Sequence, residues 1–183
     1  MELALEERLP WLCQGDVFRS VPVLTPRVLS DASVVAVSVE MGPALLITHA
    51  CAMDKATRGV PRIERLNFLP LLAVEAATPD RRGLLRRGQL QPFEAFYLGD
   101  VPELGESYTL LSEAYALPAN FFGPTVKSFE GHPSADDDTP HYLVASKNDS
   151  RLVRLGEGQL ELLWDKLNAF WTRKLPDQED ADV

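Results

Sequence analysis

The prediction of the fold depends most on the stretch SVVAVSVEMGPALLITHAC, residues 33–51. β-Branched residues dominate its first half, and an apolar run at residues 44–47 dominates its second half. Both halves have the composition of strands, and a Met-Gly-Pro sequence at residues 41–43 separates them. We therefore expect two strands joined by a hairpin turn at residues 41–43. The second strand ends in polar residues, among them His49 and Cys51, which is typical of a strand that emerges at a working surface.

Further strands are expected on both sides of this hairpin, with short connections that favour antiparallel pairing. The segment QGDVFRSVPVL, residues 14–24, begins with turn residues and continues as a strand. Near the end of the chain, GQLELLWDKLNAFWTRKL has apolar residues at the spacing of a helix face. We expect Trp164 and Leu167 on this face to be buried against the sheet. The pattern predicts a mainly β protein, a small antiparallel barrel with a C-terminal amphipathic helix.

The chain has 183 residues, which is enough for one domain with a substantial core. Leucines spaced along residues 1–13 predict an N-terminal helical arm that Pro10 limits. Residues 14–175 are expected to form the single β-barrel domain with its helix. Residues 176–183 are predicted to be an acidic, disordered tail.

The charge of the chain is distributed unevenly. The net charge is −9, which by itself argues against nucleic acid as a partner. The basic segment, residues 55–87, contains eight basic and three acidic residues and has a net charge of +5. This segment predicts an RNA-binding surface, and the alternative is two solvated surface segments. The arginines proposed to contact nucleic acid are Arg58, Arg62, Arg65, Arg82 and Arg86. If a helix forms there, Arg82 and Arg86 project together because they are four residues apart.

The N-terminus is acidic where a signal peptide needs a basic start, and no apolar stretch approaches the length of a membrane span. We therefore expect a cytoplasmic protein with no membrane partner. The sequence contains two cysteines, Cys13 and Cys51, and without a secretory signal reduced thiols are favoured over a disulfide.

His49, Cys51 and Asp54 are the candidate catalytic residues. On a strand, His49 and Cys51 share a face, and such a pair within reach can act as base and nucleophile. Asp54 would orient the imidazole ring. The alternative is that Cys51 is a packed core thiol, because cysteine is often buried. We favour packing for Cys51 and a functional role for His49, since a histidine at the polar end of a strand has more chance of facing solvent.

RNA cleavage without a metal needs an acid and a base near the 2′-hydroxyl and a cation at the phosphate. His49 and one of Arg58, Arg62 or Arg65 have the chemistry for these roles. The aromatic residues considered for base stacking are Phe68, Phe93, Phe96 and Tyr97.

Metal binding is the weaker alternative, and the sequence leads us to expect neither a metal nor another cofactor. His49 and Cys51 with His132 or His141 would give three ligands, but the spacing matches no familiar zinc motif. Three consecutive aspartates, residues 136–138, lack the spaced ligands of a calcium loop.

The order of elements resembles the MazF/PemK family of toxin endoribonucleases, whose fold is an SH3-like barrel with helical additions. The similar features are QGDVF at the first strand, GPALLIT at the hairpin strand, SYTLLSEAYALP, and the closing helix LGEGQLELLWDKLNAF. Gly42 stands where the family has its catalytic arginine, and Leu69-Pro70-Leu71-Leu72 lacks the hydroxyl of the family's catalytic threonine. Neither catalytic residue is therefore carried over.

Two functions follow as expectations. The first is an RNA-binding protein of the MazF/PemK type, with toxin endoribonuclease activity as its catalytic form and RNA held by the basic segment. The second is a non-catalytic SH3-like module that binds a protein partner. An antitoxin and a second copy of the chain are open as partners in either case.

Overall fold

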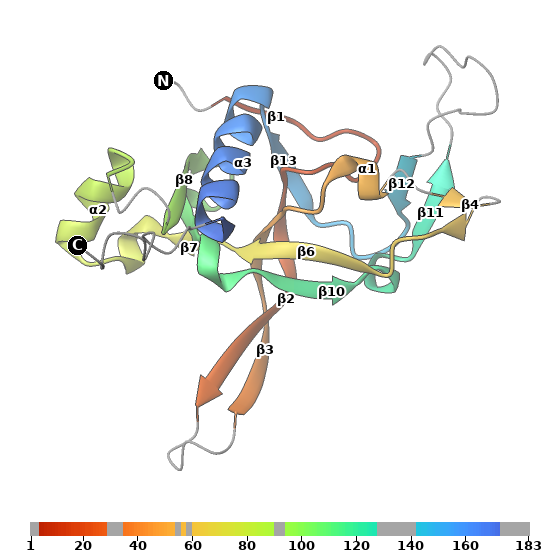
Figure 1. Ribbon diagram of the computed structural model, residues 1–183, viewed down its shortest axis with the longest axis horizontal. Helices are drawn as coiled ribbons and strands as arrows, with labels where there is room; N and C mark the ends of the chain where they lie inside the picture. Colours follow the sequence, from red (N-terminus) through yellow and green to blue (C-terminus); the bar gives the residue numbers. More distant parts are fainter. Residues whose placement is uncertain are drawn as a thin grey trace, which may run out of the picture.

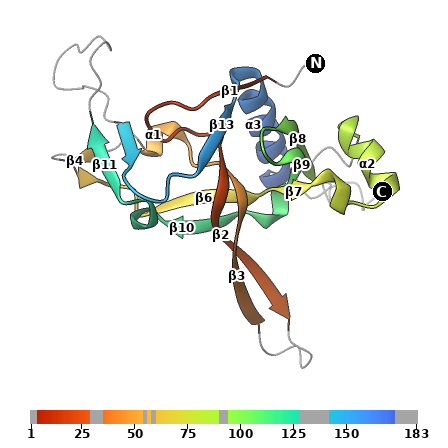
Figure 2. The ribbon, with the colours of Figure 1, turned by 180° about the vertical axis from the view of Figure 1, so that it is seen from behind.

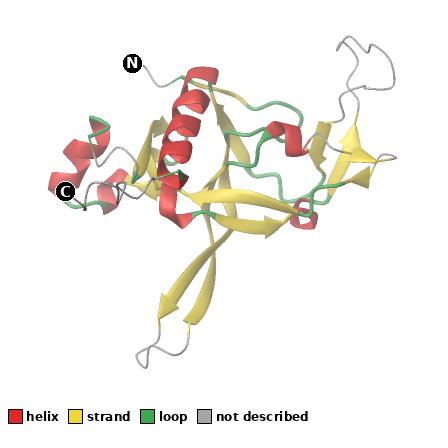
Figure 3. Cartoon of the chain, viewed as in Figure 1, coloured by secondary structure: helices red, strands yellow, loops and turns green. Residues whose placement is uncertain are grey.

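The chain folds as a mainly β protein built from antiparallel sheets, with one long helix near its C-terminal end (Figures 1 and 3). The computed structural model describes residues 4–28, 35–53, 56–57, 60–89, 94–127 and 142–172. Of residues 26–28, 35, 56–57 and 60–61 it describes only the backbone.

The largest sheet has six strands in the order β1-β13-β2-β3-β6-β10. Its strands are β1 (Leu5–Glu7), β13 (Arg151–Leu155), β2 (Asp16–Val28), β3 (Val35–Leu46), β6 (Arg65–Pro70) and β10 (Tyr115–Pro118). Every neighbouring pair in this sheet is antiparallel. In the described part of the chain, β1 and β10 are the outer strands, so this sheet is open.

Three smaller sheets accompany the large one. The first contains β7 (Leu72–Ala73), β9 (Gly105–Leu110) and β8 (Ala95–Val101). The second contains β11 (Pro124–Lys127) and β12 (Tyr142–Ala145), and the third contains β4 (Ala56–Thr57) and β5 (Val60–Pro61). The helices are α1 (Ala50–Met53), α2 (Pro79–Arg86) and α3 (Glu157–Trp171), with 3-10 turns η1 (Val74–Ala76), η2 (Leu111–Glu113) and η3 (Ala119–Phe122). The helix considered for the segment of Arg82 and Arg86 is observed as α2, and the predicted C-terminal helix is confirmed as α3. No helix in the described ranges is long and apolar enough to cross a membrane.

The prediction of two strands joined by a turn at residues 41–43 was wrong, because one continuous strand, β3, runs from Val35 to Leu46. Residues 41–43 do not reverse the chain, because Met41 and Gly42 pair with Pro22 and Val21 inside one continuous strand. The carbonyl of Pro43 accepts a hydrogen bond from the amide of Leu71, so the strand continues across the proline. The hairpin partner of β3 is therefore β2, and the two strands extend from the body as a long arm (Figures 1 and 2).

The apolar run of β3 reflects burial on both faces of the sheet. Ala44 and Leu46 lie in one core with Phe18 and Phe68, while Leu45 lies in a second core on the other face. A strand covered on both faces has no polar face, which explains why this run is continuous rather than alternating. The helix α3 covers the second core.

Of the two residues of α3 that were predicted to be buried, Leu167 is buried and Trp164 is not. Leu163 and Leu167 are fully buried in the second core. Trp164 is only partly buried and packs at the margin of this core, so the prediction that it is buried was wrong. The 100° step per residue moves Trp164 to the side of the helix, away from the buried leucines.

The predicted helical arm over residues 1–13 is wrong for the part that the structure describes. Leu5–Glu7 form strand β1, which pairs with β13 in the register Leu5↔Leu155. Leu12 is buried, and its amide donates a hydrogen bond to the carbonyl of Leu143. Pairing with distant strands satisfies the backbone here, and that tertiary gain overrides the weak helical spacing of the leucines. The predicted tail, residues 176–183, lies outside the described residues.

A buried arginine joins this N-terminal segment to the sheet. The Arg151 side chain is 2% exposed, and its Nη1 lies 3.2 Å from Oδ2 of Asp16, which is fully buried. The same nitrogen donates to the backbone carbonyls of Leu9 and Trp11, and Nε donates to Oδ1 of Asp149 at 2.7 Å. Arg151 thus connects β13 to β2 and to the chain that precedes β2.

The pKa values of the two carboxylates beside Arg151 are shifted in opposite directions. Burial raises the pKa of Asp16 to about 6, and the neighbouring guanidinium only partly opposes this shift. Hydrogen bonds from Arg151 instead hold the pKa of Asp149 below its usual value. Asp149 is half-open to solvent and loses less hydration than Asp16, so it is the better partner for the charge of Arg151.

We predict that Arg151→Ala lowers the free energy of unfolding by about 3–5 kcal/mol, because it leaves Asp16 buried without a counter-ion. Urea titration followed by circular dichroism measures this loss. Arg8→Ala is the matched control, since Arg8 pairs with Asp149 from a side chain that is 49% exposed. The control should cost about 1 kcal/mol or less. Equal losses in the two variants would show that Arg151 has no special structural role.

Candidate functional site

His49 and Cys51 lie together at the point where the chain leaves β3. The Nδ1 atom of His49 is 2.8 Å from Sγ of Cys51, and the Cys51 amide donates to the same Nδ1 at 3.2 Å. Both residues are exposed. The interpretation of Cys51 as a packed core thiol is therefore wrong. The pair does not share a strand face either, because Cys51 belongs to the short helix α1.

A buried threonine fixes the position of this turn. Thr48 is 5% exposed, and its Oγ1 accepts a hydrogen bond from the amide of Asn67 at 2.6 Å. The amide of Ile47 donates to the carbonyl of Asn67, so two bonds hold the end of β3 against β6. The carbonyl of His49 then accepts from the amide of Ala52, which starts α1. His49 is presented from a rigid backbone, even though its side chain is exposed.

His49 lines an open cavity of about 520 Å³, here called the His49 cavity. The His49 ring lies 5.5 Å from the ring of Trp164, with an angle of 52° between the planes. Trp171, at the C-terminal end of α3, is 55% exposed and lines the same cavity. The cavity is lined by Ile47, Thr48, His49, Ala52, Asn67, Ala114, Tyr115, Ala116, Trp164 and Trp171.

The polar groups of the His49 cavity are few and specific. Tyr115 contributes a buried hydroxyl with no hydrogen-bond partner in the described ranges, and burial raises the pKa of this phenol above its usual value. Nδ1 accepts from the Cys51 amide in one tautomer of His49; in the other tautomer Nδ1 carries the hydrogen, faces Cys51 Sγ and leaves Nε2 free to accept a proton. The arrangement combines an exposed proton acceptor with an aromatic wall.

Arg65 is the candidate cation beside this cavity. It lies two residues before Asn67 on β6, so the two side chains emerge on the same face of the sheet. Both are exposed, and the Arg65 side chain has no hydrogen bond or ion pair to any described residue. Arg62 is also exposed and lies just before this strand. Asp54 and Arg58, the remaining candidates from this region, lie outside the described residues.

Arg82 and Arg86 are engaged elsewhere. Arg82 Nε donates to the carbonyl of Ala77 at 2.9 Å, so this side chain holds the backbone before α2. Arg86 Nε donates to Oε1 of Glu106 at 2.9 Å and forms an ion pair with that carboxylate. Neither arginine lines the His49 cavity. The two side chains therefore do not form the joint pair that their spacing on a helix suggested.

The aromatic residues at this site differ from those that the sequence suggested. Phe68 and Phe96 are 0% and 1% exposed, so these two rings are unavailable for stacking on a nucleic-acid base. Phe93 lies outside the described residues, and the hydroxyl of Tyr97 donates to Glu106. Trp164 and Trp171 take this place at the His49 cavity. Helical spacing placed both tryptophans on α3, but it gave no signal that this helix meets His49.

Metal ligands do not cluster in the described residues. No group of three or more histidine, cysteine or acidic side chains there is arranged to hold an ion. His132, His141 and the aspartates at 136–138 lie outside the described residues. The comparisons with known proteins found no family model and no curated protein that matches the chain. The chemistry of the His49 cavity therefore rests on its own geometry.

We predict that Cys51 is the reactive thiol of the native protein. Burial raises the pKa of Cys13 to about 12, so Cys13 forms almost no thiolate at neutral pH. Iodoacetamide at pH 7.5 should modify Cys51 at least about tenfold faster than Cys13, because exposure and thiolate formation control the rate. Mass spectrometry of the single-cysteine variants Cys13→Ser and Cys51→Ser gives the two rates, and labelling in urea gives the reference. Slow labelling of Cys51 in the native protein and fast labelling only in urea would contradict an open site.

Proposed function

We propose that the chain is an RNA-binding protein of the MazF/PemK type, and that the His49 cavity is where it binds and cleaves a single strand. The observation that supports this proposal best is the meeting of an exposed histidine and two tryptophans at one open cavity, with the exposed Arg65 two residues before the lining residue Asn67 on β6. Proteins recognise unpaired RNA bases by stacking them on aromatic rings and hold the phosphates with cations.

The fold supports this proposal in its arrangement of strands and terminal helix. Antiparallel strands β2, β3 and β6 form the centre of the sheet, and α3 packs against one face. We propose that this open sheet is a variant of the SH3-like barrel of the family, with the long arm and α2 as additions. The proposal does not use the family's own catalytic positions, because Gly42 has no side chain and Leu69-Pro70-Leu71-Leu72 has no hydroxyl.

The proposed reaction is an intramolecular transesterification at one phosphate of the RNA strand. The 2′-oxygen attacks the neighbouring phosphorus, and His49 Nε2 accepts the proton of that hydroxyl. The bond between phosphorus and the 5′-oxygen breaks, and the imidazolium gives its proton to the departing oxygen. The products are a 2′,3′-cyclic phosphate and a 5′-hydroxyl. Arg65 stabilises the charge on the phosphate oxygens, and Cys51 positions the imidazole through Nδ1.

We predict that His49→Gln abolishes cleavage of a labelled single-stranded RNA but retains binding. Loss of a general base costs about 10²–10⁴-fold in rate. Cys51→Ser should keep most of the activity, since a hydroxyl can still hold Nδ1. Complete inactivity of Cys51→Ser with an active His49→Gln would instead identify the thiol as the reacting group.

The binding half of the proposal is tested by salt dependence. Arg65→Gln should reduce the slope of log affinity against log salt by about 1, as expected for one lost phosphate contact. Trp171→Ala should cost about 1–3 kcal/mol of binding free energy through lost stacking. Arg19→Gln is the matched control, because Arg19 is an exposed arginine that pairs with Glu103 on another surface. An equal effect of Arg19→Gln would contradict a specific role for Arg65.

A second candidate function is a module that binds a protein partner, and the arm favours it. Val37, Val39 and Met41 are 57%, 60% and 60% exposed, and their alternation places them on one face of β3. β3 pairs with β6 only at Ala44–Leu46, so in the described residues its outer edge is unpaired along the arm. An exposed apolar face beside a free strand edge fits strand addition by a protein segment.

We predict that a photo-crosslinking residue at position 39 forms one discrete adduct in cells, while the same residue at position 38 does not. Ser38 is the matched control because it points to the opposite face and hydrogen-bonds Thr25. The mass of the adduct separates a second copy of the chain from another protein. Adducts of equal yield at both positions, or at neither, would argue against the arm as a binding face.

A further inference from the structure

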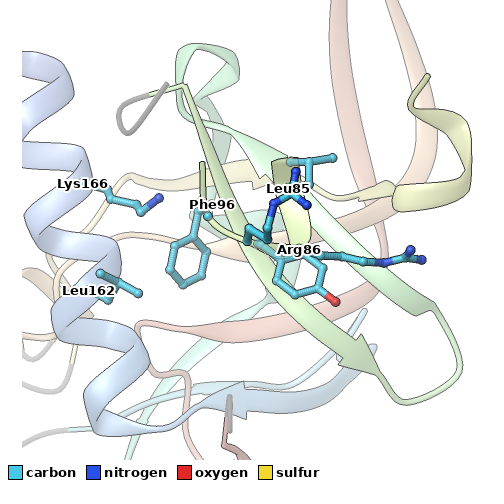
Figure 4. A pocket seen from close by; sticks show the side chains of 8 residues that line it. Leu85, Arg86, Phe96, Leu162 and Lys166 are labelled. Atoms are coloured by element: carbon cyan, nitrogen blue, oxygen red, sulfur yellow. The ribbon is translucent and has the colours of Figure 1, made fainter. Parts of the chain in front are cut away.

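A second cavity, here called the Lys166 cavity, lies between α2, β8 and α3 (Figure 4). Its volume is about 420 Å³, which lies within the range of small-molecule sites. It is lined by Leu85, Arg86, Arg87, Gly88, Phe96, Tyr97, Leu162 and Lys166. None of these residues lines the His49 cavity, so the two cavities are separate.

The floor and walls of the Lys166 cavity are apolar. Leu85 and Phe96 are 2% and 1% exposed and present hydrocarbon from α2 and β8. Leu162 adds a wall from α3, and Figure 4 shows its side chain on the same side of the cavity as Lys166, with the Phe96 ring between them and Leu85. These surfaces fit the flat, apolar body of a ligand.

Lys166 brings a positive charge into this apolar space. Its side chain is half-buried, and its Nζ donates to the carbonyl of Ala95 at 3.2 Å. No carboxylate of the described residues forms an ion pair with it. Loss of hydration lowers the pKa of the ammonium group, and no described carboxylate offsets this loss. A desolvated and unpaired cation in a cavity is favourable only when an anion can join it.

The two arginines at the rim have different roles. Arg86 is neutralised by Glu106, which also accepts a hydrogen bond from the Tyr97 hydroxyl at 2.8 Å. This network fixes one side of the cavity. Arg87 is exposed, and its side-chain hydrogen bond to a described residue is to the neutral amide of Gln89. Lys166 and Arg87 are therefore the two cations that remain for a ligand.

We propose that the Lys166 cavity binds a small molecule that joins a flat aromatic body to a phosphate, the chemistry of a nucleoside monophosphate. The ring packs beside Leu162 and Tyr97, which are only partly buried, and the phosphate meets Lys166 and Arg87. A wholly apolar ligand would leave the ammonium unpaired, and free phosphate would leave the apolar walls uncovered. The same chemistry exists at the 5′-phosphorylated end of an RNA strand, and the experiment below distinguishes the two sources. We take the free nucleotide as the ligand, and this site does not depend on RNA cleavage at His49.

The test is isothermal titration calorimetry of the full chain with adenosine 5′-monophosphate. We expect saturable binding of one molecule per chain, with adenosine and inorganic phosphate each binding at least about tenfold more weakly, since each lacks half of the contacts. In the double variant Arg65→Gln, Trp171→Ala, whose His49 cavity is impaired for RNA, a 5′-phosphorylated pentanucleotide should bind no more tightly than the mononucleotide. Tighter binding of the pentanucleotide would overturn the free nucleotide as the ligand.

The variants assign the binding to this cavity. Lys166→Met keeps the hydrocarbon stem and should weaken binding at least about tenfold, as expected when a charged hydrogen bond is lost. Arg87→Gln alters an exposed residue and should weaken binding with the fold intact. Lys127→Met on β11 is the matched control, and Trp171→Ala at the His49 cavity should also leave binding unchanged. Adenosine binding as tightly as the monophosphate, or unchanged binding in both Lys166→Met and Arg87→Gln, would overturn the proposal.

Discussion

The buried ion pair between Arg151 and Asp16 is the interaction on which the rest of the structure depends. Two charges without water are stable only when their hydrogen bonds are largely satisfied, and Arg151 does this with backbone carbonyls and a second carboxylate, Asp149. Those carbonyls belong to Leu9 and Trp11, so the pair determines the path of the N-terminal segment across β13. One oxygen of Asp16 still lacks a partner in the described residues, and its raised pKa follows from that incomplete compensation.

The positions of β2 and β3 lead directly to the candidate site. β2 aligns β3, and the bonds from Ile47 and Thr48 to Asn67 hold the end of β3 on β6. His49 follows at once, so its backbone is rigid where its side chain reaches solvent. The site is thus a consequence of sheet geometry: a strand buried on both faces emerges beside the one long helix, and the first polar side chains after it face the tryptophans of that helix.

The sequence predicted the strands, the two longer helices and His49 as an exposed residue, because each depends on local composition or spacing. The prediction failed where partners that are distant in the sequence determine the local structure. Residues 5–7 form a strand since β13 supplies their hydrogen bonds, and Gly42 continues a strand since Val21 lies opposite. Cys51 is exposed because α1 starts there, and no local pattern marks a four-residue helix. No local pattern marks Arg151 as a buried residue, since burial of a charge depends on partners that are distant in the sequence.

The helix α3 contributes to both cavities because of its own geometry. Leu163 and Leu167 form the buried stripe, and the 100° step places Leu162 and Lys166 on one flank and Trp164 and Trp171 on the other. The helix therefore separates the Lys166 cavity from the His49 cavity while forming a wall of each. The buried leucines hold α3 against the sheet, so the two cavities are built on one helix and share no residue.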